Sequence, residues 1–432
     1  MEKNAYDIAI VGGGASGLMA ACTILNRNAA PDIRVAIVEK DIRLGQKILS
    51  TGNGRCNLSN TDMDISHFHG HTLQTVESVL SRYGVSRTLD FFAKLGLMTE
   101  TESGRIYPYT GQANAVLDVL RLAIEHSPFS VVCGTPVGQI SRNKQTGNFS
   151  IHNSGTALYS RKLIVTAGGC VSHGSSSGGL DLLRCMGHTI EPVFPALTAL
   201  VLDHPGVKSL KGVRVRGKLS ISDGFGTFAS EKGELLFTTY GVSGIPAMQL
   251  SGLLHGRRGI TAHIDFFPEM SSDELTGILS NRSQSISTYK TENYFVGLLH
   301  RLVGAAIMRD VPICGTSFVS DIDNDKIQRI AVVLKDWKLP VIGAKGFAQA
   351  QVMGGGIDLS EFDPYTLESS KVPGLYAAGE VLDVYGDCGG YNLQWAWSSG
   401  MAAGVAAMEA LNSNKIPTEG KASAICAKAS NW

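Results

Sequence analysis

The first 40 residues contain the feature that most constrains the fold of this chain. An apolar run rich in β-branched residues, Tyr6 to Val11, predicts a buried parallel strand, and the run from Leu18 to Leu25 predicts a helix. Between them, Gly12, Gly14 and Gly17 occupy the three positions of G-x-G-x-x-G. In such a turn the first glycine permits the bend, the second admits a pyrophosphate, and the third lets helix and strand pack closely. The pattern therefore predicts a βαβ unit that binds a dinucleotide.

A second strand and an acid extend this pattern. The segment RVAIVEK predicts another apolar strand, and it brings Glu39 to a position 22 residues after Gly17. A carboxylate at that distance accepts a hydrogen bond from a ribose 2′-hydroxyl. An ordinary tight turn between strand and helix would need neither the acid nor its spacing, so the dinucleotide interpretation is favoured.

Composition limits the classes of protein that remain. The chain has 432 residues, enough for two or three domains, and its 38 Lys and Arg balance 38 Asp and Glu. This balance gives no sign of a nucleic-acid or membrane partner, and no apolar run is long enough to span a bilayer. The polar N-terminus does not read as a signal peptide. The eight cysteines show neither C-x-x-C nor zinc spacing. We therefore expect a reduced, cytoplasmic protein without a metal site.

The chain is predicted to be an α/β protein whose Rossmann-like three-layer domain is split in sequence. Residues 1–192 form its first part, and the segment SVVCGTPVGQISRN reads as one strand of it. Short strand-like pieces and then a polar helical stretch predict an inserted β-barrel-like plus helical domain on the substrate side, at 193–340. The α/β pattern returns at 341–415, and 416–432 form a C-terminal tail.

Three later segments favour FAD over NAD as the dinucleotide. KLIVTAGG reads as a strand that enters a turn of small residues, where backbone can cross close to a cofactor. GLYAAGEVLD predicts a strand near the C-terminus, with Asp383 reaching a ribityl hydroxyl. GGYNLQWAWSSG opens a helix whose first amides, at residues 389–392, would face the flavin N1–C2=O edge and stabilise the reduced anion. A nicotinamide dehydrogenase needs no such returning strand.

A glycine-rich loop, LGQKILSTGNGRCNLSN, follows the predicted ribose acid. We expect Lys47 and Arg55 to bring positive charge toward the phosphates, although Arg55 also fits a solvated surface position. The amides of Asn53 and Asn57 would reach the ribityl chain or the isoalloxazine. Cys56 has no partner two or three residues away, so a packing or flavin-adjacent thiol is favoured over a redox-active one.

These segments, together with GRIYP and GELLFTTYGVSG, resemble the bacterial flavoprotein family often called HI0933-like. The resemblance extends from Asp7 to about Leu411 and departs at TAGG, where the family usually has Ala-Thr-Gly-Gly. It implies one tightly bound FAD in a split domain with an inserted β-barrel and helical portion. Members include aminoacetone-oxidase-type enzymes and a bile-acid-inducible reductase.

The pattern and the resemblance together predict a set of cofactor-binding residues. They are Gly12, Gly14, Ala15, Ser16, Gly17, Glu39, Lys40, Gln46, Lys47, Gly52, Asn53, Gly54, Arg55, Cys56, Asn57, Val137, Ala167, Gly168, Gly169, Gly379, Glu380, Asp383, Gly390, Tyr391, Asn392 and Leu393.

No sequence motif identifies a catalytic residue. Tyr391 and His173 are the candidates, and each also fits a structural role: packing in the core or behind the cofactor-binding residues for Tyr391, and a solvated loop position for His173. Arg105 and Tyr107 fit either a pocket wall or the start of the following helix. Flavin chemistry needs few acid–base residues, because the cofactor itself transfers the hydride.

Three functions are considered for a protein with these features. The favoured one is a reductase in which transient NADH or NADPH reduces the flavin, and flavin N5 passes hydride to an activated C=C bond of an enone, of steroid or bile-acid type. The alternative is an aminoacetone-type amine oxidase that passes electrons to oxygen. A tRNA-linked flavoprotein is disfavoured, since the chain lacks basic runs. The expected partner is a small-molecule substrate, and the sequence leaves the oligomeric state open.

Overall fold

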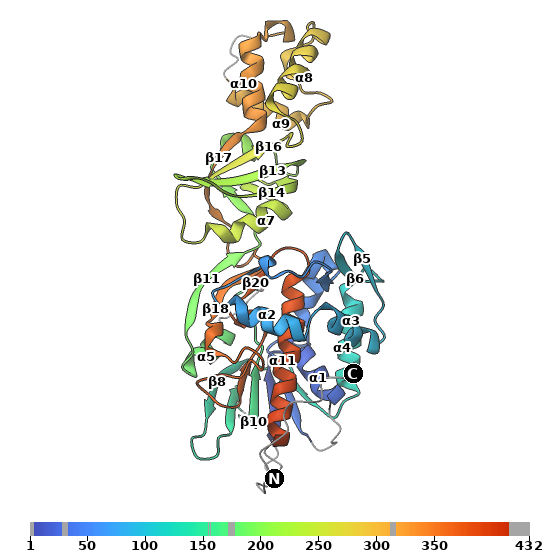
Figure 1. Cartoon of the computed structure of the whole chain (residues 1–432), viewed down its shortest axis with the longest axis vertical. Helices are drawn as coiled ribbons and strands as arrows, with labels where there is room; N and C mark the ends of the chain where they lie inside the picture. Colours follow the sequence, from blue (N-terminus) through green and yellow to red (C-terminus); the bar gives the residue numbers. More distant parts are fainter. Residues whose placement is uncertain are drawn as a thin grey trace.

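The computed structural model describes residues 4–27, 33–153, 155, 157–171, 178–311 and 317–413, and it has two bodies placed end to end (Figure 1). In the described residues the larger body contains a seven-stranded sheet of order β7-β2-β1-β10-β9-β8, with β19 beside β10. These strands are β1 (Ala5–Val11), β2 (Val35–Val38), β7 (Ser130–Val132), β8 (Val137–Arg142), β9 (Phe149–Asn153), β10 (Ala157–Val165) and β19 (Leu375–Ala377). Strands β7, β2, β1, β10 and β19 run parallel, whereas β9 is antiparallel to both of its neighbours, β10 and β8.

Helices α1 (Ala15–Arg27) and α11 (Tyr391–Ser413) pack directly against each other beside this sheet (Figure 1). Small residues permit the approach: a Cβ at Gly400 would lie 2.5 Å from the carbonyl oxygen of Ser16, and one at Gly404 would lie 2.8 Å from that of Ala20. Because the backbones are this close, α11 is held firmly over the dinucleotide turn at the start of α1.

Two small sheets and four more helices surround this core. The sheets are β3 (Ser59–Asn60) with β6 (Arg105–Pro108) and β5 (Thr99–Glu102), and β4 (Phe68–His69) with β20 (Tyr385–Gly386). The helices are α2 (Leu73–Arg82), α3 (Val85–Lys94), α4 (Ala113–Glu125) and α5 (Gly178–Cys185). Strands β3 and β20 bring residues from opposite ends of the chain to the start of α11.

The second body is a closed barrel with its own hydrophobic core. Its strands, in order around the barrel, are β12 (Leu200–Leu202), β15 (Gly241–Ser243), β14 (Gly226–Phe237), β13 (Arg214–Asp223), β16 (Thr261–Asp265) and β17 (Trp337–Ala344). Helices α8 (Ser272–Ser285), α9 (Arg301–Asp310) and α10 (Asn324–Lys335) lie at the far end (Figure 1), and α6 (Pro205–Lys208) and α7 (Ile245–Ser251) complete it. The core runs from Leu200 to Leu339.

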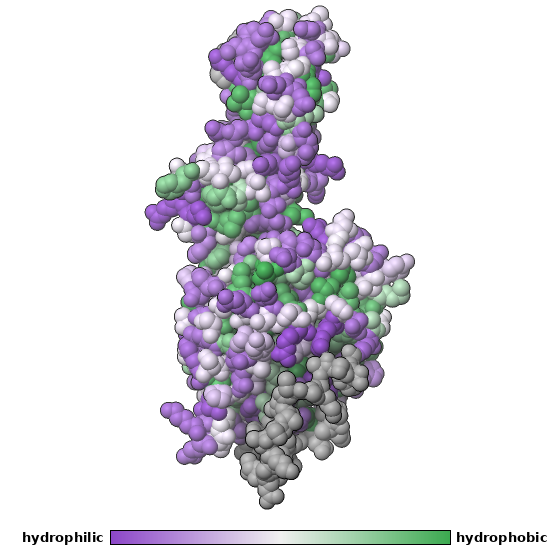
Figure 2. Space-filling model, viewed as in Figure 1, coloured by the Kyte–Doolittle hydropathy of each residue, from purple (hydrophilic) through white to green (hydrophobic). Residues whose placement is uncertain are grey.

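An antiparallel ribbon, β11 (Ile190–Ala196) and β18 (Val352–Ile357), leads from the larger body to the barrel. Beside it lies an apolar cluster that joins the two bodies. Ala196, Leu197, Val352 and Tyr385 form its centre, and Phe194, Met248 of α7 and Cys388 pack on it. Figure 2 shows a narrow waist at this level, with apolar residues gathered on the larger body just below it.

The predicted fold class is confirmed: a split α/β dinucleotide-binding domain carries an inserted barrel and helices. One local prediction was wrong. The segment SVVCGTPVGQISRN forms two strands, β7 and β8, at opposite edges of the sheet. Gly134 at the interruption has a φ of 68°, which breaks the extended run. None of the helices in the described part of the chain combines the length and apolar character that a membrane span requires.

Candidate functional site

The glycine turn has the geometry that a bound pyrophosphate needs. A Cβ at Gly17 would lie 1.9 Å from the carbonyl oxygen of Gly12, so only glycine lets α1 start this close to β1. Around Gly14, in contrast, a Cβ would meet nothing within 4 Å. The outer face of the turn is therefore open, and it lies at the N-terminus of the 13-residue helix α1. Backbone amides and the helix dipole favour an anion at such a place.

Glu39 is fixed at the end of β2, beside this turn. Its side chain accepts hydrogen bonds from the amides of Gly13, at 2.5 Å, and Asp41, at 2.9 Å. The amide of Thr135 donates to the carbonyl oxygen of Glu39, which brings Val137 near the same end of the sheet, whereas Lys40 is exposed. The carboxylate keeps further lone pairs for a ribose hydroxyl.

The glycine-rich loop begins against the same turn, because the amide of Gly45 donates to the carbonyl oxygen of Gly13 at 2.8 Å. Residues 52–54 follow with three successive positive φ angles, of 56°, 55° and 83°, in exposed backbone. Asn57 is buried and its side-chain oxygen has no partner. A buried amide of this kind requires a polar ligand to satisfy it. Gln46, at the start of the loop, is exposed.

Cys56, in the same loop, is fully buried with a φ of 56°. Burial raises the pKa of its thiol to about 12, against a smaller opposing hydrogen bond with Thr51. The thiolate, which redox chemistry requires, is therefore disfavoured at this position.

The two cations of the loop face carboxylates of this chain. Lys47 forms an ion pair with Glu380 at 2.5 Å, and Arg55 holds both oxygens of Glu102, at 3.0 and 2.5 Å. The Arg55 guanidinium also lies over the Tyr107 ring, 4.1 Å from its centroid. These two carboxylate partners are far away in the sequence, and the expectation that Lys47 and Arg55 bring charge toward the phosphates stays a prediction.

The C-terminal strand returns to the dinucleotide turn, as expected. A Cβ at Gly12 would lie 2.5 Å from the carbonyl oxygen of Thr166, so the turn after β10, with Ala167, Gly168 and Gly169, crosses the glycine turn at close range. Glu380 accepts a hydrogen bond from the amide of Met353 at 3.0 Å. A Cβ at Gly379 would lie 2.1 Å from the hydroxyl of Ser16, which ties this segment to α1.

Asp383 is 3% exposed, and its carboxylate accepts hydrogen bonds from the backbone and ring of His71, at 3.0 and 2.7 Å. The hydrogen bond to Asp383 is the main reason that the pKa of His71 lies above its usual value. A buried carboxylate held by one histidine is therefore available beside the dinucleotide site.

The start of α11 is held in place by close contacts with β3 and β20. A Cβ at Gly390, whose φ is 99°, would lie 2.5 Å from the carbonyl oxygen of Ser59, so glycine is required by this contact. The side chain of Asn392 exchanges hydrogen bonds with the backbone of Gly386, at 2.8 and 2.7 Å. The side chain of Asn392 is thus held by the protein, its backbone amide lies in the first turn of α11, and Leu393 packs on the core.

These observations fit FAD. The open face at Gly14 and the anchored carboxylate of Glu39 lie at the glycine turn, and the unpaired side-chain oxygen of Asn57 lies near Gly390 at the start of α11. They would hold the pyrophosphate, the adenosine ribose and the flavin end, respectively. When bound there, FAD supplies hydride chemistry.

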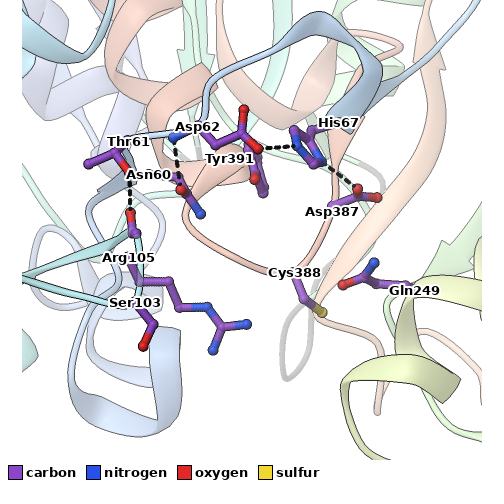
Figure 3. A pocket seen from close by; sticks show the side chains of 11 residues that line it. Asn60, Thr61, Asp62, His67, Ser103, Arg105, Gln249, Asp387, Cys388 and Tyr391 are labelled. Carbon is purple, nitrogen blue, oxygen red and sulfur yellow. Dashed lines mark hydrogen bonds and ion pairs between the residues drawn. The ribbon is translucent and has the colours of Figure 1, made fainter. Parts of the chain in front are cut away.

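A cavity of about 300 Å³ opens beside the start of α11 (Figure 3). It brings together two residues singled out in the sequence, Arg105 and Tyr391, and others that were missed. The lining is Asn60, Thr61, Asp62, His67, Ser103, Gly104, Arg105, Gln249, Asp387, Cys388 and Tyr391. Gln249 comes from α7, so the cavity lies between the larger body and the barrel. His173 falls outside the described residues.

A partly exposed cluster of histidines and carboxylates forms one wall of this cavity. Asp387 contacts His67 at 3.0 Å and His69 at 2.8 Å, and the other ring nitrogen of His67 contacts Asp62 at 3.2 Å. Burial lowers the pKa of His67, but the hydrogen bonds to Asp387 and Asp62 outweigh it, so this pKa lies above its usual value. The run HFHGH offered a signal for the cluster, because alternate residues of a strand share a face.

A model of the HI0933-like protein Rossmann domain matches residues 6–406. The chain belongs to the HI0933-like family. With that family comes the class of enzyme: this HI0933-like protein is an FAD-dependent oxidoreductase.

Relatives of known activity match almost the whole chain. The 3-dehydro-bile acid delta(4,6)-reductase of Clostridium scindens is 36% identical over 410 residues, which are 93% of this chain and 99% of that protein. The ribosomal RNA dihydrouridine synthase of Escherichia coli is 28% identical over 410 residues, 93% of this chain and 97% of that one.

Among solved structures, the 3-ketosteroid delta1-dehydrogenase of Sterolibacterium denitrificans, in complex with 1,4-androstadiene-3,17-dione, aligns with a TM-score of 0.50 and 13% identity. The alignment covers 94% of this chain and all of that one. At this identity the likeness shows a shared fold alone.

Proposed function

We propose that this HI0933-like protein is a reductase that saturates a C=C bond conjugated to a carbonyl group, with NADH or NADPH as electron donor and a steroid-like small molecule as substrate. The observation that carries the proposal is the cavity beside α11. Its polar wall presents Arg105 and Tyr391, and its edge at Cys388 meets the apolar cluster of Phe194 and Met248. A polar end beside an apolar wall suits a flat hydrophobic ketone.

The relatives support the reaction class. The name of the Clostridium scindens enzyme denotes reduction of C=C bonds in a 3-oxo bile acid, and dihydrouridine is uridine with its C5=C6 bond saturated. In both, the double bond is conjugated to a carbonyl group. We favour the small molecule over RNA, because this chain has equal numbers of basic and acidic residues, and RNA binding relies on excess positive charge.

The electron donor is proposed to visit the site transiently. The glycines of VMGGGIDL, which could suggest a second nucleotide turn, lie within β18 and are buried. Cβ atoms at Gly354 and Gly355 would lie 2.3 Å from the Phe194 ring and 2.2 Å from the carbonyl oxygen of Pro192. These glycines therefore serve packing against β11, and the nicotinamide would approach through the same cavity as the substrate.

The test is anaerobic stopped-flow spectroscopy of the yellow protein. We expect NADH or NADPH to bleach the flavin, and 4-androstene-3,17-dione to restore its colour far faster than air does. The matched control is 5α-androstane-3,17-dione, which has the same skeleton without the double bond and should restore nothing. Recolouring by air alone would favour the amine oxidase, and dihydrouridine formation in ribosomal RNA without steroid reduction would favour an RNA substrate.

A further inference from the structure

Tyr391 is a closely packed polar side chain of the cavity wall. It is 4% exposed, and its ring stacks on His67 with centroids 4.4 Å apart and meets the edge of Phe68 at 5.9 Å. A Cβ at Gly386 would lie 2.5 Å from the Cβ of Tyr391, and one at Gly389 would lie 3.0 Å from its ring. Packing on every side therefore fixes the ring in one orientation.

The hydroxyl of Tyr391 has no hydrogen-bond partner among the described residues, whereas the neighbouring His67 contacts both Asp62 and Asp387. A tyrosine this buried usually finds a partner for its O–H. Burial raises the pKa of the hydroxyl to about 12, and Asp62 and Asp387 add to the shift. The group therefore keeps its proton at neutral pH and is free to donate it to a ligand in the cavity.

Arg105 is the second unpaired group of the same wall. It lies at the start of β6, where the backbone pairs with Asn60 and Glu102, but its guanidinium forms no ion pair with any described residue. In Figure 3 its side chain extends into the opening that Cys388 and Gln249 border from the other side. Arginine stays charged in proteins and readily binds oxygen anions, whereas it is a poor proton donor.

We propose that Tyr391 is the proton donor of this cavity and that Arg105 holds the carbonyl oxygen of the substrate, an assignment that rests on the proposed reductase function. With FAD held at the glycine turn and by Glu39, the reduced cofactor would supply the hydride for the carbon β to the carbonyl. The π electrons of the C=C bond move to form an enolate, whose oxygen is held by Arg105. The α carbon then takes H⁺ from the Tyr391 hydroxyl, and solvent returns a proton to the phenolate. One hydride and one proton thus saturate one C=C bond.

Other side chains of the cavity suit this role less well. Both ring nitrogens of His67 are occupied, one by Asp387 and the other by Asp62. The thiol of Cys388 packs on the apolar cluster between the two bodies. His67 is then a positioning residue, since it fixes the ring of Tyr391 by stacking.

The test compares Tyr391→Phe with Tyr376→Phe in the FAD-loaded protein. Tyr376 of β19 is the control, because it is also a buried tyrosine but lies neither in the cavity lining nor in the apolar cluster. In single-turnover experiments with 4-androstene-3,17-dione, the flavin of the Tyr391→Phe variant should regain its colour about 10²–10⁴-fold more slowly than that of wild type, because the general acid has been removed. Bleaching by the nicotinamide and binding of 5α-androstane-3,17-dione should stay unchanged, and Tyr376→Phe should behave as wild type.

Two further measurements separate the roles. Arg105→Gln should weaken binding of 5α-androstane-3,17-dione by about tenfold or more, because a charged hydrogen bond to the carbonyl oxygen is lost. In D₂O, wild type should place deuterium on one face of the α carbon, whereas Tyr391→Phe should lose this stereochemistry. Recolouring of Tyr391→Phe at the wild-type rate, with the same deuterium stereochemistry, would overturn the assignment alone. A wild-type protein that reduces no enone would overturn the proposed function and the assignment together.

Discussion

Replacement of Glu39 by glutamine tests how the protein holds the adenosine end of FAD. The carboxylate is 8% exposed and already accepts the amides of Gly13 and Asp41, one on each oxygen. Since each carboxylate oxygen can accept two hydrogen bonds, lone pairs remain for a ribose hydroxyl. Glutamine keeps the size of the side chain but removes its charge and turns one acceptor into a donor.

The magnitude follows from these contacts. A hydrogen bond to a charged group contributes about 1.5–3 kcal/mol, so loss of one ribose contact should raise the FAD dissociation constant about tenfold to a hundredfold. Whichever way the new amide turns, the N–H of Gly13 or of Asp41 faces another donor. That unsatisfied group should also destabilise the apoprotein by about 1–3 kcal/mol.

The assay is titration of apoprotein with FAD, followed by quenching of flavin fluorescence, together with urea unfolding of each apoprotein. Asp41→Asn is the control, because this exposed residue carries the same charge two positions away. We expect the control to bind FAD as wild type does. If Glu39→Gln also binds FAD within about twofold of wild type, Glu39 only braces the glycine turn and is not the ribose ligand.

The remaining predictions address the flavin end and stability. Heat should release FAD rather than FMN, and chromatographic recovery of FMN would contradict the adenosine site. Asp383→Asn should shift the reduction potential by a few tens of millivolts in dye-equilibration titrations, since about 30 mV corresponds to 1.4 kcal/mol; an unchanged potential would place the carboxylate away from the flavin. Gly390→Val should lower the melting temperature, because its side chain meets Ser59; full stability would refute that clash. Burial raises the pKa of Glu361, but hydrogen bonds, chiefly that from Lys371, outweigh it and lower the pKa to about 2. The charged Glu361 therefore stabilises the folded protein above pH 4.5, and this stabilisation is lost as the pH falls toward 2. In Glu361→Gln the urea midpoint of unfolding should depend less on pH between 4.5 and 2. If this pH dependence is the same as in wild type, other groups cause the acid sensitivity.

The dinucleotide fold could be predicted from the sequence because its determinants are local. The glycine turn, the strands on either side of it and Glu39 all fall within the first 40 residues, and each has a steric or electrostatic reason that short-range pattern reveals. The break between β7 and β8 could not be predicted in this way. Both halves are equally strand-like, and only the sheet as a whole decides that they lie at opposite edges.

The ion-pair partners of Arg55 and Lys47 could not be predicted from the sequence for a related reason. Arg55 lies 47 residues from Glu102, and Lys47 lies 333 residues from Glu380, so nothing local marks either pair. Without partners, a cation in a glycine-rich loop reads as a phosphate ligand. In the structure each of these cations is paired with a carboxylate, and the backbone amides and dipole of α1 provide an attraction for a pyrophosphate that depends on neither side chain.

The start of α11 offers a physical basis for coupling between the proposed cofactor and substrate sites. The same turn of helix is locked to β20 through Asn392 and to β3 through Gly390, so its amides and the Tyr391 ring move as one unit. If FAD contacts those amides, any shift of the cofactor is transmitted directly to the hydroxyl that faces the cavity. A hydride donor and a proton donor must address adjacent carbons of one substrate, and a single braced helix end is a direct way to keep their separation constant.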